Sequence, residues 1–499
     1  MTGASAQPTA ESRGTLRTGE PAVVTDAAPL ACVLTLGCAK NEVDSDKMRA
    51  ELAASGIGLT DEVAAADVAV VNTCAFLASA VEEGIELILD VADELEGAGR
   101  GGKLVVAGCM PSRYGADLAA ELTEVDAFVD VADEKAIAEV VLGLVGRGAR
   151  GSGGSDDTDG TDRCDIDSTD IDTTGTAGTA VPACDAASGT RTRHDVGPYS
   201  YVKISEGCDR RCTYCMIPAI RGGHESRPMG DIVSEVAELA RAGTSEIVFI
   251  AQDTGAWGRD LEGSPTLSTL LATCADEWPE VWFRILYVQP DGVTDELLET
   301  IASHGNICPY IDMPLQHASG PILRRMGRSG SAAEFLDMLS HMRSVVPDLA
   351  TRTTFMTGFP GEGEDDFEEL LDFADDAEFD FAGVFAFSRE EGSAAALLDG
   401  QVDAEVKLSR AQQLLDAAES VGTNAIRRFV GREMPVLVEG YERTDVGLEA
   451  LCRSRWQAPE VDGQVHVPIE SEADAPIGSF LDVRVTDTFF FEWEAECRE

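Results

Sequence analysis

Three cysteines lie within eight positions of the stretch SEGCDRRCTYCMIPAIRG, residues 205–222, as Cys208, Cys212 and Cys215. This C-x3-C-x2-C spacing lets three thiolates from one loop converge on one centre, which is typical of iron–sulfur ligation. A structural zinc site would need a fourth ligand, and His224 is the only nearby candidate. A [4Fe–4S] cluster held by three cysteines instead leaves one iron open to a small ligand, so we predict such a cluster here.

A second set of cysteines is spread along the N-terminal region. Cys38 follows the run ACVLTLG, Cys74 follows VAVVNT and Cys109 follows KLVVAG, and each run is a predicted strand. Because the carboxyl ends of parallel strands meet at one edge of a sheet, the three thiols are expected at the same edge. The spacing favours a second three-cysteine site, and buried cysteines that happen to end strands are the alternative.

The elements that position these cysteines alternate between strands and helices. In residues 29–146 the alternation predicts a small α/β domain with a parallel sheet. Residues 196–423 repeat β/α units, as in EIVFIAQ and ATRTTFMTGF, which predicts a full or partial β/α barrel with its chemistry at the carboxyl ends of the strands. Residues 424–499 hold short strand-like runs, so a small all-β barrel is expected. The predicted fold class is therefore α/β multidomain.

Two segments have a different composition. Residues 1–28 are rich in Ala, Thr, Gly and Pro and contain no apolar core for a signal peptide, so we predict a disordered tail. Residues 147–195 contain ten Asp, no Glu and many Gly, Ser and Thr, which is typical of a flexible acidic linker.

The overall charge limits the partners. Ninety acidic residues against 38 basic ones give a formal net charge of −52, which repels phosphate backbones and favours a basic partner. Adaptation to a salty environment is an equally good origin for the excess. No run of 18 apolar residues occurs, so we expect no membrane span and a cytoplasmic protein. In a reducing compartment, 13 cysteines point to metal binding or catalysis.

The CDRRCTYC loop, placed after the first strand of a β/α barrel, resembles the radical S-adenosylmethionine (SAM) superfamily. The resemblance implies that the open iron binds the amino and carboxylate groups of SAM. It further implies that an electron from the cluster, supplied by an external donor, cleaves SAM to a 5′-deoxyadenosyl radical. The motif leaves the substrate open.

Further motifs make the chain from Ala31 onward resemble the methylthiotransferases of the RimO type: LGCAKNEVDSDKM, NTCAFLASA, IAQDTGAWG, RILYVQP and TGFPGE. The tRNA-modifying MiaB type more often reads Gln-Met-Asn where this chain has Ala39, Lys40 and Asn41. RimO-type enzymes modify an aspartate of the small-subunit ribosomal protein number twelve.

The resemblance to methylthiotransferases implies two [4Fe–4S] clusters and a C-terminal TRAM domain. Cys208, Cys212 and Cys215 would hold the radical-generating cluster. An auxiliary cluster on the second cysteine set, Cys38, Cys74 and Cys109, would carry the sulfur, and the methylthio group would reach the β-carbon of the target aspartate.

The resemblance also implies which residues contact SAM. Gln252 and Asp253 follow the strand EIVFIA, Arg221 would meet the carboxylate, and Gly358 and Glu362 in GFPGE would approach the adenine or ribose. Each of these residues also has a simpler interpretation. Gln252 and Asp253 could cap the next helix, Arg221 could neutralise nearby acidic side chains, and GFPGE could be an ordinary turn.

The C-terminal domain bears on whether the substrate is protein or RNA. Residues 431–499 contain sixteen acidic residues and six arginines, a surface that repels phosphate, so nucleic-acid binding is disfavoured. A basic ribosomal protein, free or on the ribosome, is the expected partner. Methylthiolation of a tRNA adenosine and a non-catalytic two-cluster electron carrier stay open as alternatives.

Deleting residues 151–190 is predicted to preserve methylthiotransferase activity, because a flexible linker only has to span the two domains. Peptide mass spectrometry on the reconstituted deletion variant measures this. A dead variant with both clusters intact contradicts the prediction.

Overall fold

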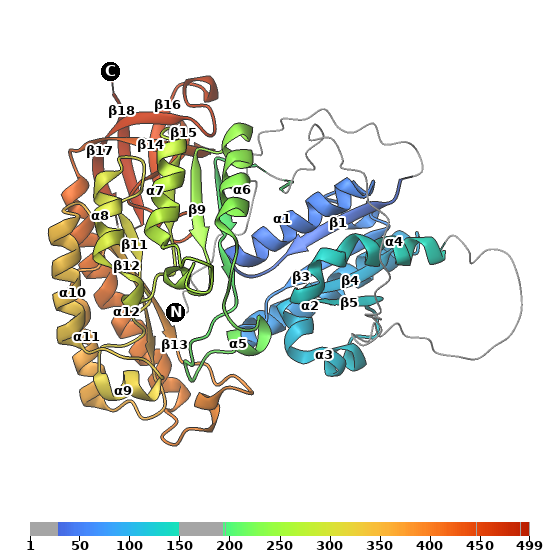
Figure 1. Cartoon of the computed structure of the whole chain (residues 1–499), viewed down its shortest axis with the longest axis horizontal. Helices are drawn as coiled ribbons and strands as arrows, with labels where there is room; N and C mark the ends of the chain where they lie inside the picture. The colour runs from blue at the N-terminus through green and yellow to red at the C-terminus, as the bar shows by residue number, and fades with distance from the viewer. Residues whose placement is uncertain (1–27, 149–192, 195, 446, 490, 499) are drawn as a thin grey trace, which may run out of the picture.

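The computed structural model describes residues 28–148, 193–194, 196–445, 447–489 and 491–498. The predicted disordered tail and most of the predicted acidic linker lie outside the described residues. An N-terminal lobe, residues 28–148, lies beside a larger lobe, which contains the described residues from 196 onward (Figure 1).

The N-terminal lobe is a five-stranded parallel sheet between two layers of helices. Its strands, in the order β2-β1-β3-β4-β5, are β1 Leu30–Thr35, β2 Gly58–Leu59, β3 Val68–Thr73, β4 Lys103–Gly108 and β5 Ala127–Asp130. All six residues of β3 are buried, as expected of a parallel strand covered on both faces. Helices α1 (Ala39–Ala54) and α4 (Ile137–Gly148) pack on one face, and α2 (Ala78–Ala98) and α3 (Cys109–Glu121) on the other.

The larger lobe is built on six parallel strands in two adjoining sheets, β10-β9-β6 and β11-β12-β13. The strands are β6 Tyr199–Lys203, β9 Glu246–Ile250, β10 Trp282–Ile285, β11 Tyr310–Asp312, β12 Ala350–Thr357 and β13 Phe381–Ala386. A backbone hydrogen bond of 3.0 Å from Val288 to Asp312 joins the two sheets. The six strands form a partial barrel, one of the two forms that the sequence predicts.

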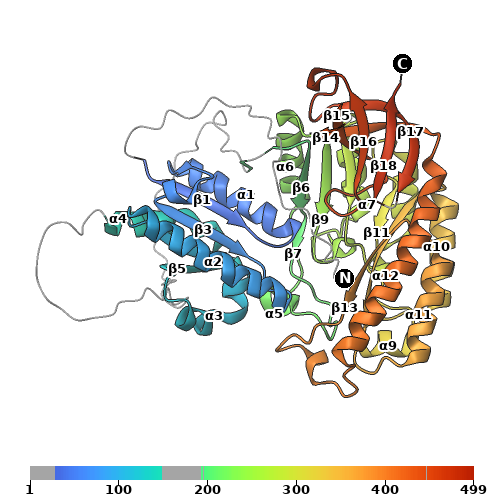
Figure 2. The ribbon, with the colours of Figure 1, turned by 180° about the vertical axis from the view of Figure 1, so that it is seen from behind.

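Helices cover the outside of the partial barrel, and Figure 2 shows α10, α11 and α12 beside the last strands. The long helices are α6 Met229–Ala242, α7 Leu267–Glu277, α8 Asp295–Ser303, α10 Ala332–Val345, α11 Glu364–Ala377 and α12 Ala404–Ile426. Short elements connect them: β7 Ser205–Glu206, α5 Ile217–Ile220, β8 Glu225–Ser226 and α9 Gly320–Arg325. Single 3-10 turns span Val63–Ala65, Val131–Ala136, Thr254–Ala256, Pro290–Gly292, Ala394–Leu397, Arg427–Phe429 and Glu472–Asp474.

The C-terminal segment closes into a five-stranded barrel in the order β14-β15-β16-β18-β17. Its strands are β14 Glu433–Thr444, β15 Gly447–Ser454, β16 Gln464–Ile469, β17 Phe480–Phe489 and β18 Glu492–Cys497. Trp493 fills its core, and the same apolar cluster includes Val248 and Ile250 of β9. Their neighbours Ile247 and Phe249 pack instead against the outer helices. The small barrel covers the amino-terminal ends of the partial-barrel strands, where Trp282 packs on Phe480 and Phe381 stacks on Phe491.

The predicted fold class is confirmed, and the exact domain boundaries stay a prediction. A search of the described helices for one long and apolar enough to cross a membrane finds none.

A buried ionic cluster ties the two barrels together. Glu246 of β9 accepts a hydrogen bond of 2.6 Å from Arg284 Nε, and it also pairs with Arg453 of β15. All three side chains are almost fully buried. Burial raises the pKa of Glu246, but the two guanidinium groups outweigh burial and hold that pKa below its ordinary value.

Replacing Glu246 by Gln is predicted to destabilise the protein by about 3–5 kcal/mol, because it leaves buried guanidinium charge uncompensated. Urea denaturation measures the change. Because the pKa of Glu246 is lowered on folding, its contribution is present above the ordinary carboxyl pKa and is lost as pH falls through the lowered value. The variant should therefore lose part of the wild-type dependence of stability on acid pH.

Asp348→Ala is the matched control, because Asp348 pairs with Arg432 at 3.0 Å while both side chains stay exposed. Its cost should stay below about 1 kcal/mol. Equal costs for the two variants would contradict the prediction.

Candidate functional site

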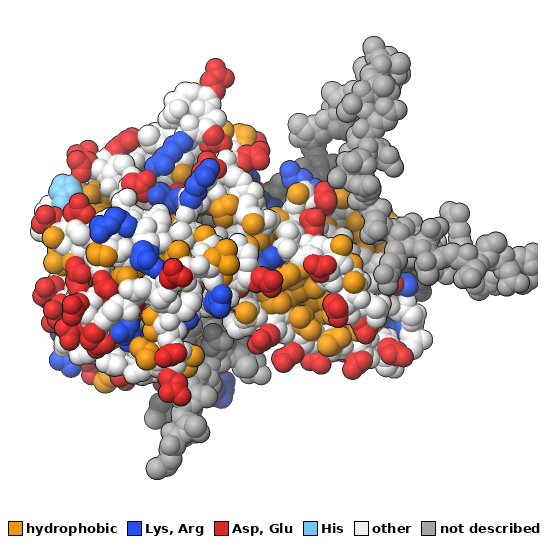
Figure 3. Space-filling model, turned by 90° about the horizontal axis from the view of Figure 1, so that it is seen from below, with side chains coloured by type: hydrophobic (Ala, Val, Ile, Leu, Met, Phe, Trp, Pro, Cys, Tyr) orange, Lys and Arg blue, Asp and Glu red, His pale blue; other side chains and the backbone are white. Residues whose placement is uncertain are grey.

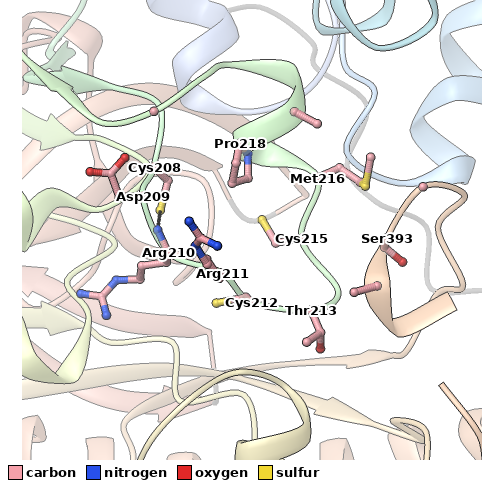
Figure 4. Close-up of a pocket in the computed structure, with 14 residues that line it drawn as sticks. Cys208, Asp209, Arg210, Arg211, Cys212, Thr213, Cys215, Met216, Pro218 and Ser393 are labelled. Atoms are coloured by element: carbon pink, nitrogen blue, oxygen red, sulfur yellow. Dashed lines mark hydrogen bonds between the residues drawn. The ribbon is translucent and has the colours of Figure 1, made fainter. Parts of the chain in front are cut away.

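The loop between β7 and α5 carries Cys208, Cys212 and Cys215, and all three line one pocket of about 440 Å³. Figure 4 shows their sulfur atoms around the same open space. Gly207 starts the loop at φ +69°, and a Cβ there would lie 2.0 Å from the carbonyl oxygen of Gly223. Only glycine fits this close approach, and it turns the chain so that the loop lies across the carboxyl end of the barrel.

The surroundings of the three thiols suit a cluster that carries negative charge. The backbone N–H of Arg210 donates to Cys208 Sγ at 3.4 Å, and that of Ile217 donates to Cys215 Sγ at 3.5 Å. Arg328 Nη1 lies 3.9 Å from Cys212 Sγ. Burial raises the pKa of Cys208, and it raises that of Cys215 to about 12.

The second cysteine set gathers at the carboxyl edge of the N-terminal sheet, as the sequence predicts. Cys38 precedes α1, Cys74 follows β3 and Cys109 begins α3 directly after β4. A Cβ at Gly37, where φ is +109°, would lie 3.3 Å from Cys74 Sγ, so glycine is required for this approach. Burial raises the pKa of Cys74, and it raises that of Cys109 to about 11.

Asn41 is the hub of the second cysteine set. Its side-chain nitrogen donates to the carbonyl oxygens of Leu36 and Thr73, both at 2.9 Å, and so joins the ends of β1 and β3. Its Oδ1 lies 3.8 Å from Cys38 Sγ and 4.0 Å from Cys109 Sγ. One amide therefore fixes the loops that present the three thiols.

Both cysteine sets fit iron–sulfur chemistry by their donors. Each offers three soft thiols, the ligand type of iron–sulfur clusters. Among the described residues, no three His, Cys, Asp or Glu side chains are drawn together tightly enough to hold a single metal ion.

Arg221, which the sequence predicts as a SAM contact, lies at the second cysteine set. Its Nη2 donates to Asn41 Oδ1 at 2.9 Å, and its Nη1 lies 3.1 Å from both Asp44 and Glu206. Its side chain is 2 % exposed. Arg221 thus reaches from the loop of the first cysteine set to the hub of the second, and a contact with SAM stays a prediction.

The predicted polar pair after β9 braces the first cysteine loop. Asp253 accepts a hydrogen bond of 2.6 Å from Arg210, which also pairs with Asp291. Gln252 donates to Glu206 at 2.8 Å. Whether either residue also contacts SAM stays a prediction.

Gly358 and Glu362 form a tight turn after β12. Glu362 Oε2 accepts the backbone N–H of Gly358 at 2.7 Å, its Oε1 pairs with Arg410 at 2.8 Å, and His317 lies 3.5 Å away. Gly358 has φ +71°, and a Cβ there would lie 2.2 Å from the Lys407 side chain. The glycine is needed for this turn, and its predicted contact with SAM stays a prediction.

Arg113 of α3 makes another ionic contact between the lobes, in addition to that of Arg221. This contact is not predicted from the sequence. The Arg113 guanidinium pairs with Glu390 at 3.2 Å, and both side chains are buried. Glu390 also accepts the N–H of Ala78 at 3.0 Å, and it lies two residues before Gly392 at the rim of the first pocket.

Three family models match the chain in order. The model described as "Uncharacterized protein family UPF0004" matches residues 31–130, the Radical SAM superfamily matches residues 202–374 and the TRAM domain matches residues 430–497. A protein of Geobacter sulfurreducens called "Ribosomal protein uS12 methylthiotransferase RimO" is 38% identical over 93% of this chain and 98% of its own length. A protein of the same name from Moorella thermoacetica is 39% identical over 92% and 96%.

The chain belongs to the RimO family of methylthiotransferases. It is therefore an enzyme of the radical SAM sulfur-transferase type, and this membership implies SAM and a [4Fe–4S] cluster. Among solved structures, the radical SAM methyltransferase TsrM of Kitasatospora setae aligns at 15% identity and a TM-score of 0.49, over 72% of this chain and 73% of that chain.

In this RimO-family chain, Arg221→Lys is predicted to weaken retention of iron at the second cysteine set by about 10- to 100-fold, because lysine cannot reach Asn41, Asp44 and Glu206 together. The measurement is iron per chain, with the electron paramagnetic resonance (EPR) spectrum of the reduced cluster. It is made in a Cys208, Cys212 and Cys215 to Ala background, so that only the second set can bind iron.

Arg227→Lys is the control, since Arg227 pairs with Glu235 at 2.7 Å and makes its contacts away from the thiols. Weaker SAM binding by the otherwise native Arg221→Lys enzyme, with unchanged iron at the second set, would contradict the prediction.

Proposed function

We propose that this chain transfers a methylthio group to the β-carbon of an aspartate in ribosomal protein uS12. One observation supports the proposal beyond the family likeness: a direct hydrogen bond of 2.9 Å from Arg221 to Asn41 joins the segment that follows the first cysteine loop to the hub of the second set. Arg221 comes from the loop of the first set, and the amide oxygen to which it donates lies beside Cys38 and Cys109 of the second. A radical formed at one set and sulfur held at the other could therefore act on one carbon atom.

We infer two [4Fe–4S] clusters. Cys208, Cys212 and Cys215 would hold the one that binds SAM, and Cys38, Cys74 and Cys109 would hold the auxiliary one. When bound, the first group supplies a substrate radical and the second supplies sulfur; an external donor provides electrons.

The chain's own residues hold the first cysteine loop in place. Asp253 and Asp291 hold Arg210, so the turn after Cys208 keeps one conformation. Tyr214 lies between two of the cysteine ligands, and its ring packs edge-on against Phe359 at a centroid distance of 6.5 Å. This contact anchors the segment between Cys212 and Cys215 to the turn that begins at Gly358.

The surface suits a basic protein substrate. Acidic side chains are spread over both lobes in Figure 3. Leu397, which is 85 % exposed, stands in the short turn whose first residue, Ala394, lines the first pocket. We propose that a basic segment of uS12, free or on the ribosome, approaches through this acidic field in the cytoplasm and rests an apolar residue on Leu397.

The decisive experiment is anaerobic reconstitution with iron and sulfide, followed by incubation with SAM, a reductant and purified uS12. Peptide mass spectrometry should show a gain of about 46 Da, a methylthio group in place of hydrogen, on one aspartate. If 5′-deoxyadenosine accumulates while uS12 stays unmodified, the substrate is wrong and tRNA is tried next. If SAM is not cleaved at all, the electron-carrier alternative is favoured.

Replacing either cysteine set by alanine is predicted to remove about half of the reconstituted iron, since each set would hold one cluster. Loss of Cys208, Cys212 and Cys215 should also abolish SAM cleavage. Loss of Cys38, Cys74 and Cys109 should leave cleavage in place and abolish methylthio transfer. Unchanged iron after the second replacement would refute the auxiliary cluster.

A further inference from the structure

Lys40 is buried in the first turn of α1, one residue before the hub residue Asn41. Its side chain enters the space between the lobes, where its Nζ lies 3.2 Å from the centroid of the Tyr287 ring. The residue is only 8 % exposed. Tyr287 follows β10 at the carboxyl end of the partial barrel and has φ +63°, so both partners stand at the rim where the two lobes meet.

The ammonium of Lys40 has no anionic partner among the residues that the structure describes, where it makes neither an ion pair nor a hydrogen bond. The neighbouring carboxylates are engaged elsewhere. Asp312 pairs with Arg352 at 3.2 Å and accepts the N–H of Tyr287 at 3.1 Å. Glu206 is held by Lys203, Arg221 and Gln252.

A buried ammonium without a counter-ion is costly, and the face of an aromatic ring compensates for only part of that cost. An anionic group of a substrate would compensate the rest of that cost. Cys38 lies two residues before Lys40 on the chain, so an anion there would lie beside the auxiliary cysteine set.

We propose that Lys40 binds the side-chain carboxylate of the target aspartate and selects for it. This inference rests on the proposed function. The carboxylate carbon of an aspartate is bonded directly to the β-carbon. A cation that fixes the carboxylate therefore fixes the reacting carbon to within one bond, beside the auxiliary thiols. A neutral nucleobase would leave Lys40 without a counter-ion, so the same residue disfavours adenosine.

The test is a double-mutant cycle with the clusters loaded and no reductant, so that binding is measured without turnover. Two fluorescent uS12 peptides, one with the target aspartate and one with asparagine in its place, are titrated against wild-type enzyme and Lys40→Met by anisotropy. Wild-type enzyme should bind the aspartate peptide about 10- to 100-fold more tightly, and Lys40→Met should bind both peptides alike.

Lys47→Met is the matched control, because Lys47 lies in the same helix but pairs with Glu235 at 3.8 Å. It should keep the wild-type preference for aspartate. Lys40→Arg, which keeps the charge, should keep part of that preference. Iron per chain confirms that each variant is loaded, and Lys40→Gln replaces Lys40→Met if the latter does not assemble.

Two results would overturn the inference, and they are distinguishable. If Lys40→Met keeps the full aspartate preference and instead changes the EPR spectrum of the auxiliary cluster, Lys40 serves the cluster and not the substrate. If wild-type enzyme neither binds nor modifies the aspartate peptide, the proposed function itself fails, and the inference fails with it.

Discussion

The buried charge cluster between α1 and the first strands of the partial barrel is the interaction on which the site depends. Asp44 of α1 pairs with Lys203 of β6 and with Arg221, and Glu206 binds the same two cations. Removing one member would leave a buried charge without a partner, at a cost of about 3–5 kcal/mol. The lobes therefore have one favoured arrangement, and in it the two cysteine sets face each other. Figure 1 shows the start of α1 beside the barrel strands.

The same topological rule places both cysteine sets. Each follows the carboxyl ends of parallel strands, in one case those of a flat sheet and in the other those of a partial barrel. Because the backbone beyond a strand end makes no ladder hydrogen bonds, the loops there can present thiols without disturbing the sheets. The two edges are joined by direct contacts, since Arg221 pairs with Asp44 and donates to Asn41, and Arg113 pairs with Glu390.

The strands of the N-terminal sheet and the positions of its three thiols could be predicted from the sequence, because both depend on patterns within a few neighbouring residues. An apolar run followed by a cysteine predicts both the strand and the position of the thiol, as at Cys38, Cys74 and Cys109. The place of Arg221 was not predictable in this way. It lies near Cys215 along the chain, which suggests a SAM contact, but its partners Asp44 and Asn41 lie 177 and 180 residues away. The one available signal is the acidic run in the first helix, where Asp44, Ser45 and Asp46 are all buried. Buried neighbouring acids require cations from another part of the chain.

Helix α1 therefore differs from an ordinary amphipathic helix, because it buries charged and polar side chains as well as apolar ones. Ala39 and Val43 join the apolar cluster beneath the partial barrel, while Asp44 and Asp46 bind Lys203 and Arg193. Its first turn, which begins directly after Cys38, holds the hub residue Asn41 and Lys40, whose ammonium lies over the Tyr287 ring. One turn of helix thus carries both the amide that lies beside Cys38 and Cys109 and the ammonium that lies over Tyr287 of the larger lobe. Lys40 and Asn41 touch different groups, because the ammonium lies over the Tyr287 ring while the amide holds the ends of β1 and β3. A substitution at one of them can therefore change the charge at the rim, or the placement of the thiols, without changing the other.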